Sequence, residues 1–219
     1  MRTLAKVFTP LVWLAALIIL PLLGVRLSGE PVSGYLEFPP RTQVVDHAGF
    51  SRPVFVVLAV LAAGFVLFFD VRCFRARRGI APAPARYRLP WWGWAGLVCL
   101  GLAWTAAWTR LPWLRPVQRY TFAPLWIGYV VVANALTYRR KRACLLTHRT
   151  GYFLLLFPVS AVFWWFFEYL NRFVHNWYYV NTDTLTASRY FLQATLPFAT
   201  VIPAVLSTST ALATWLPMA

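Results

Sequence analysis

The sequence is poor in acidic residues and in charge of either sign. Of its 219 residues, 6 are Asp or Glu and 21 are Lys or Arg, so charged residues make up only 12% of the chain. A soluble domain has about a quarter of its residues charged, spread over its solvent-facing surface. The scarcity of charge therefore excludes an ordinary soluble domain, and a hydrophobic content of 60% indicates a membrane protein.

Cysteine and histidine are also rare, with three residues of each. Cys73, Cys99 and Cys144 are far apart and form no C-x-x-C pair, which excludes a cysteine-based metal site. No H-x-x-x-H or E-x-x-H spacing occurs either. The sequence therefore predicts no metal centre, and it identifies no cofactor.

The chain contains instead a series of charge-free stretches of bilayer length. They hold 19, 17, 21, 19, 18 and 30 residues, and a spanning helix needs roughly 17–25. They predict an all-α polytopic bundle, a single integral membrane domain over residues 1–219. The predicted spans are 7–23, 53–69, 91–108, 120–138, 151–170 and 190–215.

The distribution of Lys and Arg predicts the orientation of these spans. One side of the predicted topology carries 13 of these residues and the other carries 8, and the excess marks the cytoplasmic side. Both termini are therefore predicted in the cytoplasm, with loops 24–52, 109–119 and 168–189 outside a bacterial inner membrane. The net charge of +15 is explained by this excess of Lys and Arg on the cytoplasmic side, where basic residues contact the anionic headgroups of the lipid bilayer. No nucleic acid partner is therefore expected.

Glu168 is the most conspicuous single residue. It ends the apolar run that starts at Gly151, and an acid at the edge of hydrocarbon usually faces a partner or a cavity. If the helix continues beyond it, Asn171, Arg172, His175 and Tyr179 fall within an arc of about 100° on the same helix face. We predict Glu168 as a catalytic acid or base with His175 as its proton partner.

Further polar residues are expected on the same outer side of the membrane. The predicted loop 24–52 contributes acids and a histidine, and one more acid follows Tyr179. These residues are Glu30, Glu37, Asp46, His47 and Asp183. The residues predicted to bind substrate are Asn171, Arg172, Asn176, His47 and Asp46.

Other interpretations of this cluster stay open. Glu168 could form an ion pair with Arg172 at i+4 that only stabilises the helix. Glu168, His175, His47 and Asp46 could bind a divalent cation, although their spacing gives little support. Arg172 could hold a phosphate or a lipid headgroup.

Asn134 is a polar residue within the fourth predicted span. An amide in this position more often joins helices through hydrogen bonds than contacts a substrate. We therefore expect Asn134 to pack between helices.

Three stretches in the second half resemble a group of bacterial polytopic inner-membrane proteins of unassigned function. They are Phe122-Ala-Pro-Leu-Trp-Ile-Gly-Tyr129, the segment from Ser160 to Tyr179, and Phe198-Ala-Thr-Val-Ile-Pro-Ala-Val205. The resemblance implies a multi-pass membrane fold and no particular activity.

Three functions are compatible with these observations. The first is a membrane-embedded enzyme that acts on a lipid or isoprenoid at the outer interface, where the Glu168 face would leave the bilayer. The second is a non-catalytic subunit of a larger membrane complex, which the 12 tryptophans would suit. The third is a small-solute transporter.

Overall fold

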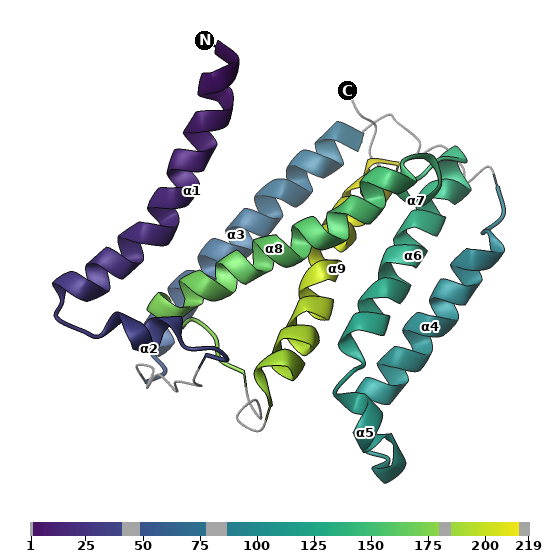
Figure 1. The fold of residues 1–219 in the computed structure, drawn as a ribbon. Helices are drawn as coiled ribbons and strands as arrows, with labels where there is room; N and C mark the ends of the chain where they lie inside the picture. Colours follow the sequence, from purple (N-terminus) through teal and green to yellow (C-terminus); the bar gives the residue numbers. More distant parts are fainter. Residues whose placement is uncertain (1, 41–48, 78–86, 180–184, 215–219) are drawn as a thin grey trace. The chain divides into compact units, whose positions relative to one another are not determined.

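A computed structural model describes residues 2–40, 49–77, 87–179 and 185–214. These residues form helices and no strand, which confirms the all-α class (Figure 1). The helices are α1 (Arg2–Leu27), α2 (Val32–Leu36), α3 (Arg52–Arg77), α4 (Trp91–Trp108), the 3-10 helix η1 (Pro112–Leu114), α5 (Arg115–Gln118), α6 (Phe122–Lys141), α7 (Leu145–His148), α8 (Thr150–Val174) and α9 (Ala187–Ala213).

Each of the six predicted spans falls on one of the long helices, but fewer helices meet the requirements for crossing a membrane. Among the described residues, Arg52–Arg75 of α3, all of α8 and all of α9 are long and apolar enough. A fourth span results if Pro112–Gln118 and α6 count as one element with a bend of 73°. The all-helical class is thus confirmed, and the number of six spans stays a prediction.

The chain divides into two compact units. One contains Met1–Val45 and Ala161–Phe198, and the other contains Asp46–Ser160 and Ala199–Ala219. Helices α8 and α9 each contribute one part to each unit.

In the unit that contains residues 46–160, α4 and α6 pack closely because glycines line their contact (Figure 1). A Cβ atom on Gly93 would lie 2.6 Å from the Cβ of Ala135. A Cβ atom on Gly128 would lie 2.8 Å from the backbone nitrogen of Leu100. Small residues of this kind let two helix backbones approach where no hydrophobic force drives association, as in a bilayer.

The same unit has its hydrophobic core between α6, the first half of α8 and the end of α9. Val130, Phe153, Leu156 and Ala204 form the buried cluster. These four side chains come from three helices, so the core joins them into one packed unit.

Asn134 lies fully buried beside this core. Its Nδ2 donates to the carbonyl of Val130 at 2.9 Å and to Ser207 Oγ at 2.8 Å, and its Oδ1 accepts the backbone N–H of Leu146 at 3.1 Å. The amide therefore connects α6 with α9 and with the start of α7, which confirms its expected role between helices.

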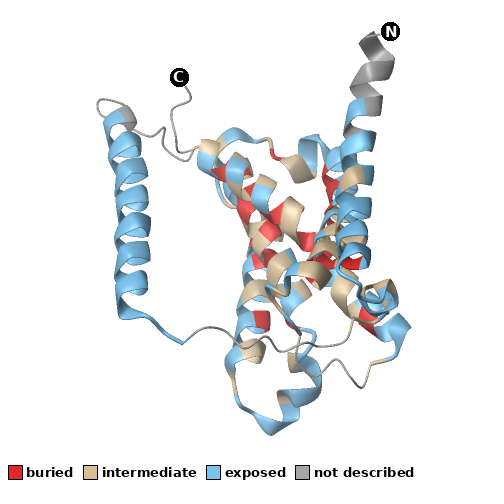
Figure 2. Cartoon of the chain, turned by 90° about the vertical axis from the view of Figure 1, so that its left-hand side faces the viewer, coloured by how far each residue is buried: buried red, intermediate tan, exposed pale blue. Residues whose placement is uncertain are grey.

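Helix α3 differs from the other long helices in its burial. Every residue from 52 to 75 is exposed (Figure 2), although the helix is strongly apolar. Within this chain the described part of α3 thus presents apolar side chains in all directions. Such a surface is stable only in contact with lipid or with another protein.

Candidate functional site

Glu168 lies in the second half of α8, within the unit that contains residues 161–198, and is 3% exposed. Its Oε2 accepts hydrogen bonds from Trp177 Nε1 at 3.2 Å and from the Tyr179 hydroxyl at 3.1 Å. Its Oε1 accepts one from the Tyr190 hydroxyl at 3.3 Å. The buried carboxyl group is thus held by three neutral donors. Hydrogen bonds of this kind compensate part of the loss of water that burial imposes.

The end of α8 explains how Trp177 and Tyr179 reach Glu168. The helix stops at Val174, and His175 adopts the left-handed conformation with φ of 50°. This is a common way to terminate a helix. The common helix face of Glu168, His175 and Tyr179 depended on the helix continuing beyond Glu168, and α8 ends before His175 and Tyr179. The chain turns at His175, and the residues after it return to the carboxylate.

Asn171 fixes this turn. Its Oδ1 accepts the backbone N–H groups of Asn176 at 2.9 Å and Trp177 at 3.2 Å, and its Nδ2 donates to the Trp177 carbonyl at 2.7 Å. Both ends of its amide are therefore occupied by backbone groups. Asn171 positions residues 176–177, and Asn176 takes part through its backbone N–H while its side chain is exposed.

Arg172 has partners on a different segment. Its Nη1 donates to the carbonyls of Tyr35 and Glu37, each at 2.9 Å. These carbonyls lie at the C-terminal end of α2 and immediately after it, so Arg172 connects α2 with α8. No ion pair joins the described side chains of Glu168 and Arg172, and the alternative of a stabilising i+4 pair is wrong.

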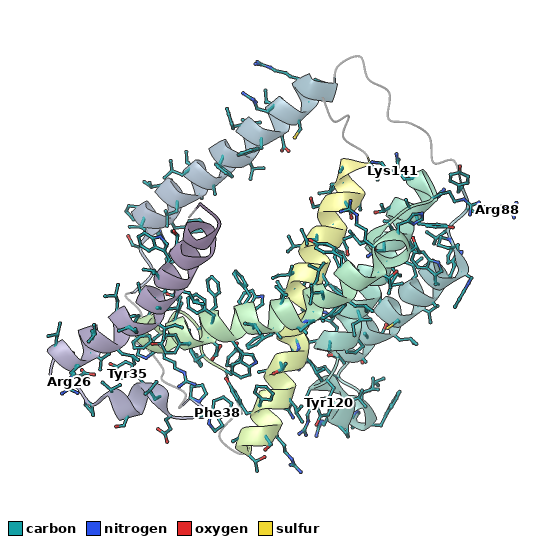
Figure 3. The ribbon with its side chains drawn as sticks, turned by 45° about the horizontal axis from the view of Figure 1, so that its top comes forward. Arg26, Tyr35, Phe38, Arg88, Tyr120 and Lys141 are labelled. Atoms are coloured by element: carbon teal, nitrogen blue, oxygen red, sulfur yellow. The ribbon has the colours of Figure 1, made fainter. Side chains whose placement is uncertain are left out.

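Aromatic side chains surround these polar groups. Phe38, which follows α2 (Figure 3), packs against Trp165 and Tyr190 with ring centroids 5.8 and 5.5 Å apart. Tyr35 stacks on Phe173 at 5.3 Å. The packing holds the segment after α2 against α8 and orients the Tyr190 ring whose hydroxyl reaches Glu168.

A cavity of about 520 Å³ opens beside Glu168 within this unit. We call it the Glu168 cavity. Besides Glu168 it is lined by Glu30, Glu37, Arg172 and His175. Glu30 and Glu37, which were expected on the same side of the membrane as Glu168, line its cavity. Asp46, His47 and Asp183 lie outside the described residues.

His175 lines the cavity without bonding to Glu168. Its ring forms no hydrogen bond with another described residue, and its backbone N–H donates to the Asn171 carbonyl at 2.8 Å. The hydroxyls of Tyr179 and Tyr190 occupy the place predicted for His175 beside the carboxylate. Among the described residues, no group of three His, Cys, Asp or Glu side chains could hold a metal ion.

The Glu168 cavity favours protonated tyrosines at its edge. Burial raises the pKa of Tyr179, and the negative charge of Glu168 together with the hydrogen bond between them raises it further. The hydrogen bond to Glu30 raises the pKa of Tyr35. Both phenols are therefore donors at neutral pH, and each one orients a carboxylate.

Sequence reasoning missed two of the three side chains that hold Glu168. Aromatic residues are commonly enriched at the membrane interface, and this accounts for Trp177 without any bond to Glu168. The sequence therefore offers no reason to pair the two residues. Tyr190 is 22 residues away on α9, and no local spacing connects it with Glu168.

No known protein family, no curated protein and no solved structure matches this chain. Its function is therefore inferred from the geometry of the Glu168 cavity.

Proposed function

We propose that this chain is an integral membrane enzyme whose substrate is a lipid or isoprenoid, with the polar end of the substrate in the Glu168 cavity. The observation that carries the proposal is a buried carboxylate with neutral donors that lines a cavity. A cavity with a few convergent polar groups is the usual place of a binding or catalytic site. Helices α3, α8 and α9 supply the apolar surface that such a protein needs.

In this proposal Glu168 takes a proton from the substrate or gives one to it. The hydroxyls of Tyr179 and Tyr190 keep the carboxylate oriented. Their hydrogen bonds stabilise its negative charge while the proton is on the substrate. His175 lines the same cavity and can exchange protons with a bound molecule. Arg172 donates to backbone carbonyls through Nη1, so the two N–H groups of Nη2 are available to orient the substrate.

The test is the lipid composition of a strain that lacks the gene. We expect one lipid or isoprenoid species to be lost or its precursor to accumulate, and wild-type protein to restore it. Glu168→Gln keeps the size of the side chain and removes its ability to act as a base, so it should restore less than about 1% of the activity. Unchanged lipids in the deletion strain would contradict the proposal.

We further propose six spans in the cell inner membrane, with both termini in the cytoplasm and the Glu168 cavity at the outer surface. The charge-free stretches and the bias of Lys and Arg support this topology. The cavity would then lie at the depth of lipid headgroups on the outer leaflet.

Labelling of single cysteines tests this topology in a variant without Cys73, Cys99 and Cys144. Ser33→Cys should react with a membrane-impermeant maleimide in intact cells, because Ser33 is exposed on a predicted outer loop. Lys141→Cys, also exposed, should react only after the membrane is permeabilised. The reverse pattern would invert the topology.

A second candidate function is that of a subunit in a larger membrane complex. The exposure of α3 on all sides from residue 52 to residue 75 favours it, since a partner helix could cover this surface. Purification in a mild detergent should then yield the chain together with other membrane proteins. Elution of a folded, lone monomer would count against a subunit role.

A further inference from the structure

We propose that the Glu168 cavity is selective for an ammonium-bearing headgroup, of the kind formed by ethanolamine attached to a phosphodiester. This inference rests on the proposed function, because it specifies the class of lipid that enters the cavity. Its basis is the charge of the cavity, its aromatic lining and the position of one arginine.

The cavity is acidic although the chain is strongly basic. The net charge of the chain is +15, whereas the described residues that line the cavity include three acids, Glu30, Glu37 and Glu168, and one arginine, Arg172. Three of the 6 acidic residues are therefore gathered in one cavity. Such a concentration of negative charge attracts a cation and repels an anionic headgroup.

Aromatic rings complete a site suited to a cation. Tyr35, Trp177, Tyr178 and Tyr190 line the cavity, and ring faces attract ammonium groups. Two of the carboxylates are already oriented, because the Tyr35 hydroxyl donates to Glu30 at 2.8 Å and the Tyr190 hydroxyl donates to Glu168. A cation that enters therefore meets acceptors that need little reorganisation.

Arg172 indicates that the ligand carries a phosphate in addition to an amine. It lines the same cavity, and among the described residues its hydrogen bonds to backbone carbonyls come from Nη1 alone, which leaves the N–H groups of Nη2 for a ligand. A guanidinium is the preferred partner of a phosphate. A headgroup with a phosphate next to an ammonium would therefore pair its two charges with Arg172 and with the carboxylates. A cavity of about 520 Å³ is of ordinary size for such a ligand.

Calorimetric titration of the purified full chain in detergent tests this selectivity. The probes are short-chain phosphatidylethanolamine, phosphatidylglycerol with the same acyl chains, and ethanolamine alone. We expect phosphatidylethanolamine to bind at least about tenfold more tightly than either of the other two. Glu37→Gln should weaken its binding about tenfold, the usual effect of losing one charged partner.

One variant serves as a control for Glu37→Gln, and another serves as a second test. Asp70→Asn removes one negative charge from the exposed helix α3 and should leave the affinity unchanged. Glu30 lies on the exposed edge of the cavity, so Glu30→Gln should fold normally and weaken binding. It therefore tests the role of the acids if Glu37→Gln does not fold.

The outcomes separate this inference from the proposed function. Equal affinity for the two lipids, or no effect of Glu30→Gln and Glu37→Gln, would overturn the selectivity for an ammonium and leave a lipid function standing. Ethanolamine binding as tightly as its lipid would support the cation site and contradict a lipid substrate. Absence of binding for all three probes would overturn the inference.

Discussion

Glu168→Ala should reduce the stability of the protein in detergent by about 3–5 kcal/mol, more than alanine at any other described acid, because three donors lose their acceptor. The substitution removes the acceptor of Trp177 Nε1 and of the Tyr179 and Tyr190 hydroxyls. Donors that lose their partner inside a folded protein cost about 1–3 kcal/mol each, and rotation of the hydroxyls recovers a part. Thermal and denaturant-induced unfolding, followed by circular dichroism, would measure the loss.

Two variants separate the role of Glu168 in folding from its role in chemistry. Glu168→Gln retains one acceptor oxygen and should be destabilised much less than Glu168→Ala, while activity is lost in both. Glu30→Ala affects an exposed acid and should change stability by less than about 1 kcal/mol. If Glu168→Ala is as stable and as active as the wild type, Glu168 has neither role.

Gly128→Val should disrupt the packing of α4 against α6 and reduce stability by about 1–3 kcal/mol. A Cβ atom at this position would lie 2.8 Å from the Leu100 nitrogen and 3.1 Å from the Gly96 carbonyl oxygen. These are backbone atoms, so no side chain can rotate away and the two helices must separate. The loss would appear as a lower unfolding temperature in detergent.

Gly101→Val is the matched control for Gly128→Val. Gly101 also lies in this helix pair, on α4, and a Cβ atom there would meet nothing within 4 Å. The substitution should leave stability unchanged or raise it slightly, since glycine is a poor helix former. Equal effects of the two substitutions would mean that close packing at Gly128 does not stabilise the fold.

The positions of the helices could be predicted because charge is costly in hydrocarbon and therefore marks helix ends. The predicted span 91–108 coincides with α4, which Pro90 precedes. The number of spans follows less directly from the sequence, for a physical reason. Counting uncharged residues treats the five tryptophans of α4 like aliphatic residues, although tryptophan prefers the interface to the hydrocarbon.

Only the residues of the candidate site that lie on α8 could be predicted to lie close together. Glu168, Asn171 and Arg172 lie on α8, and their common location followed from helical spacing. The end of α8 depends on a left-handed residue that is not glycine, His175, and such a turn has no reliable sequence signal. The bond from Tyr190 depends on tertiary packing between α8 and α9.

The three hydrogen bonds to Glu168 have a consequence for any proton that this residue binds. A carboxylate can accept from Trp177, Tyr179 and Tyr190 at once, whereas a carboxylic acid carries an O–H that must itself find an acceptor. The indole N–H of Trp177 cannot serve as one. A phenol oxygen can accept, so proton uptake at Oε2 or Oε1 requires the hydroxyl of Tyr179 or Tyr190 to turn from donor to acceptor. The two tyrosine hydroxyls, and not the indole of Trp177, are therefore the groups that reorient when Glu168 binds a proton.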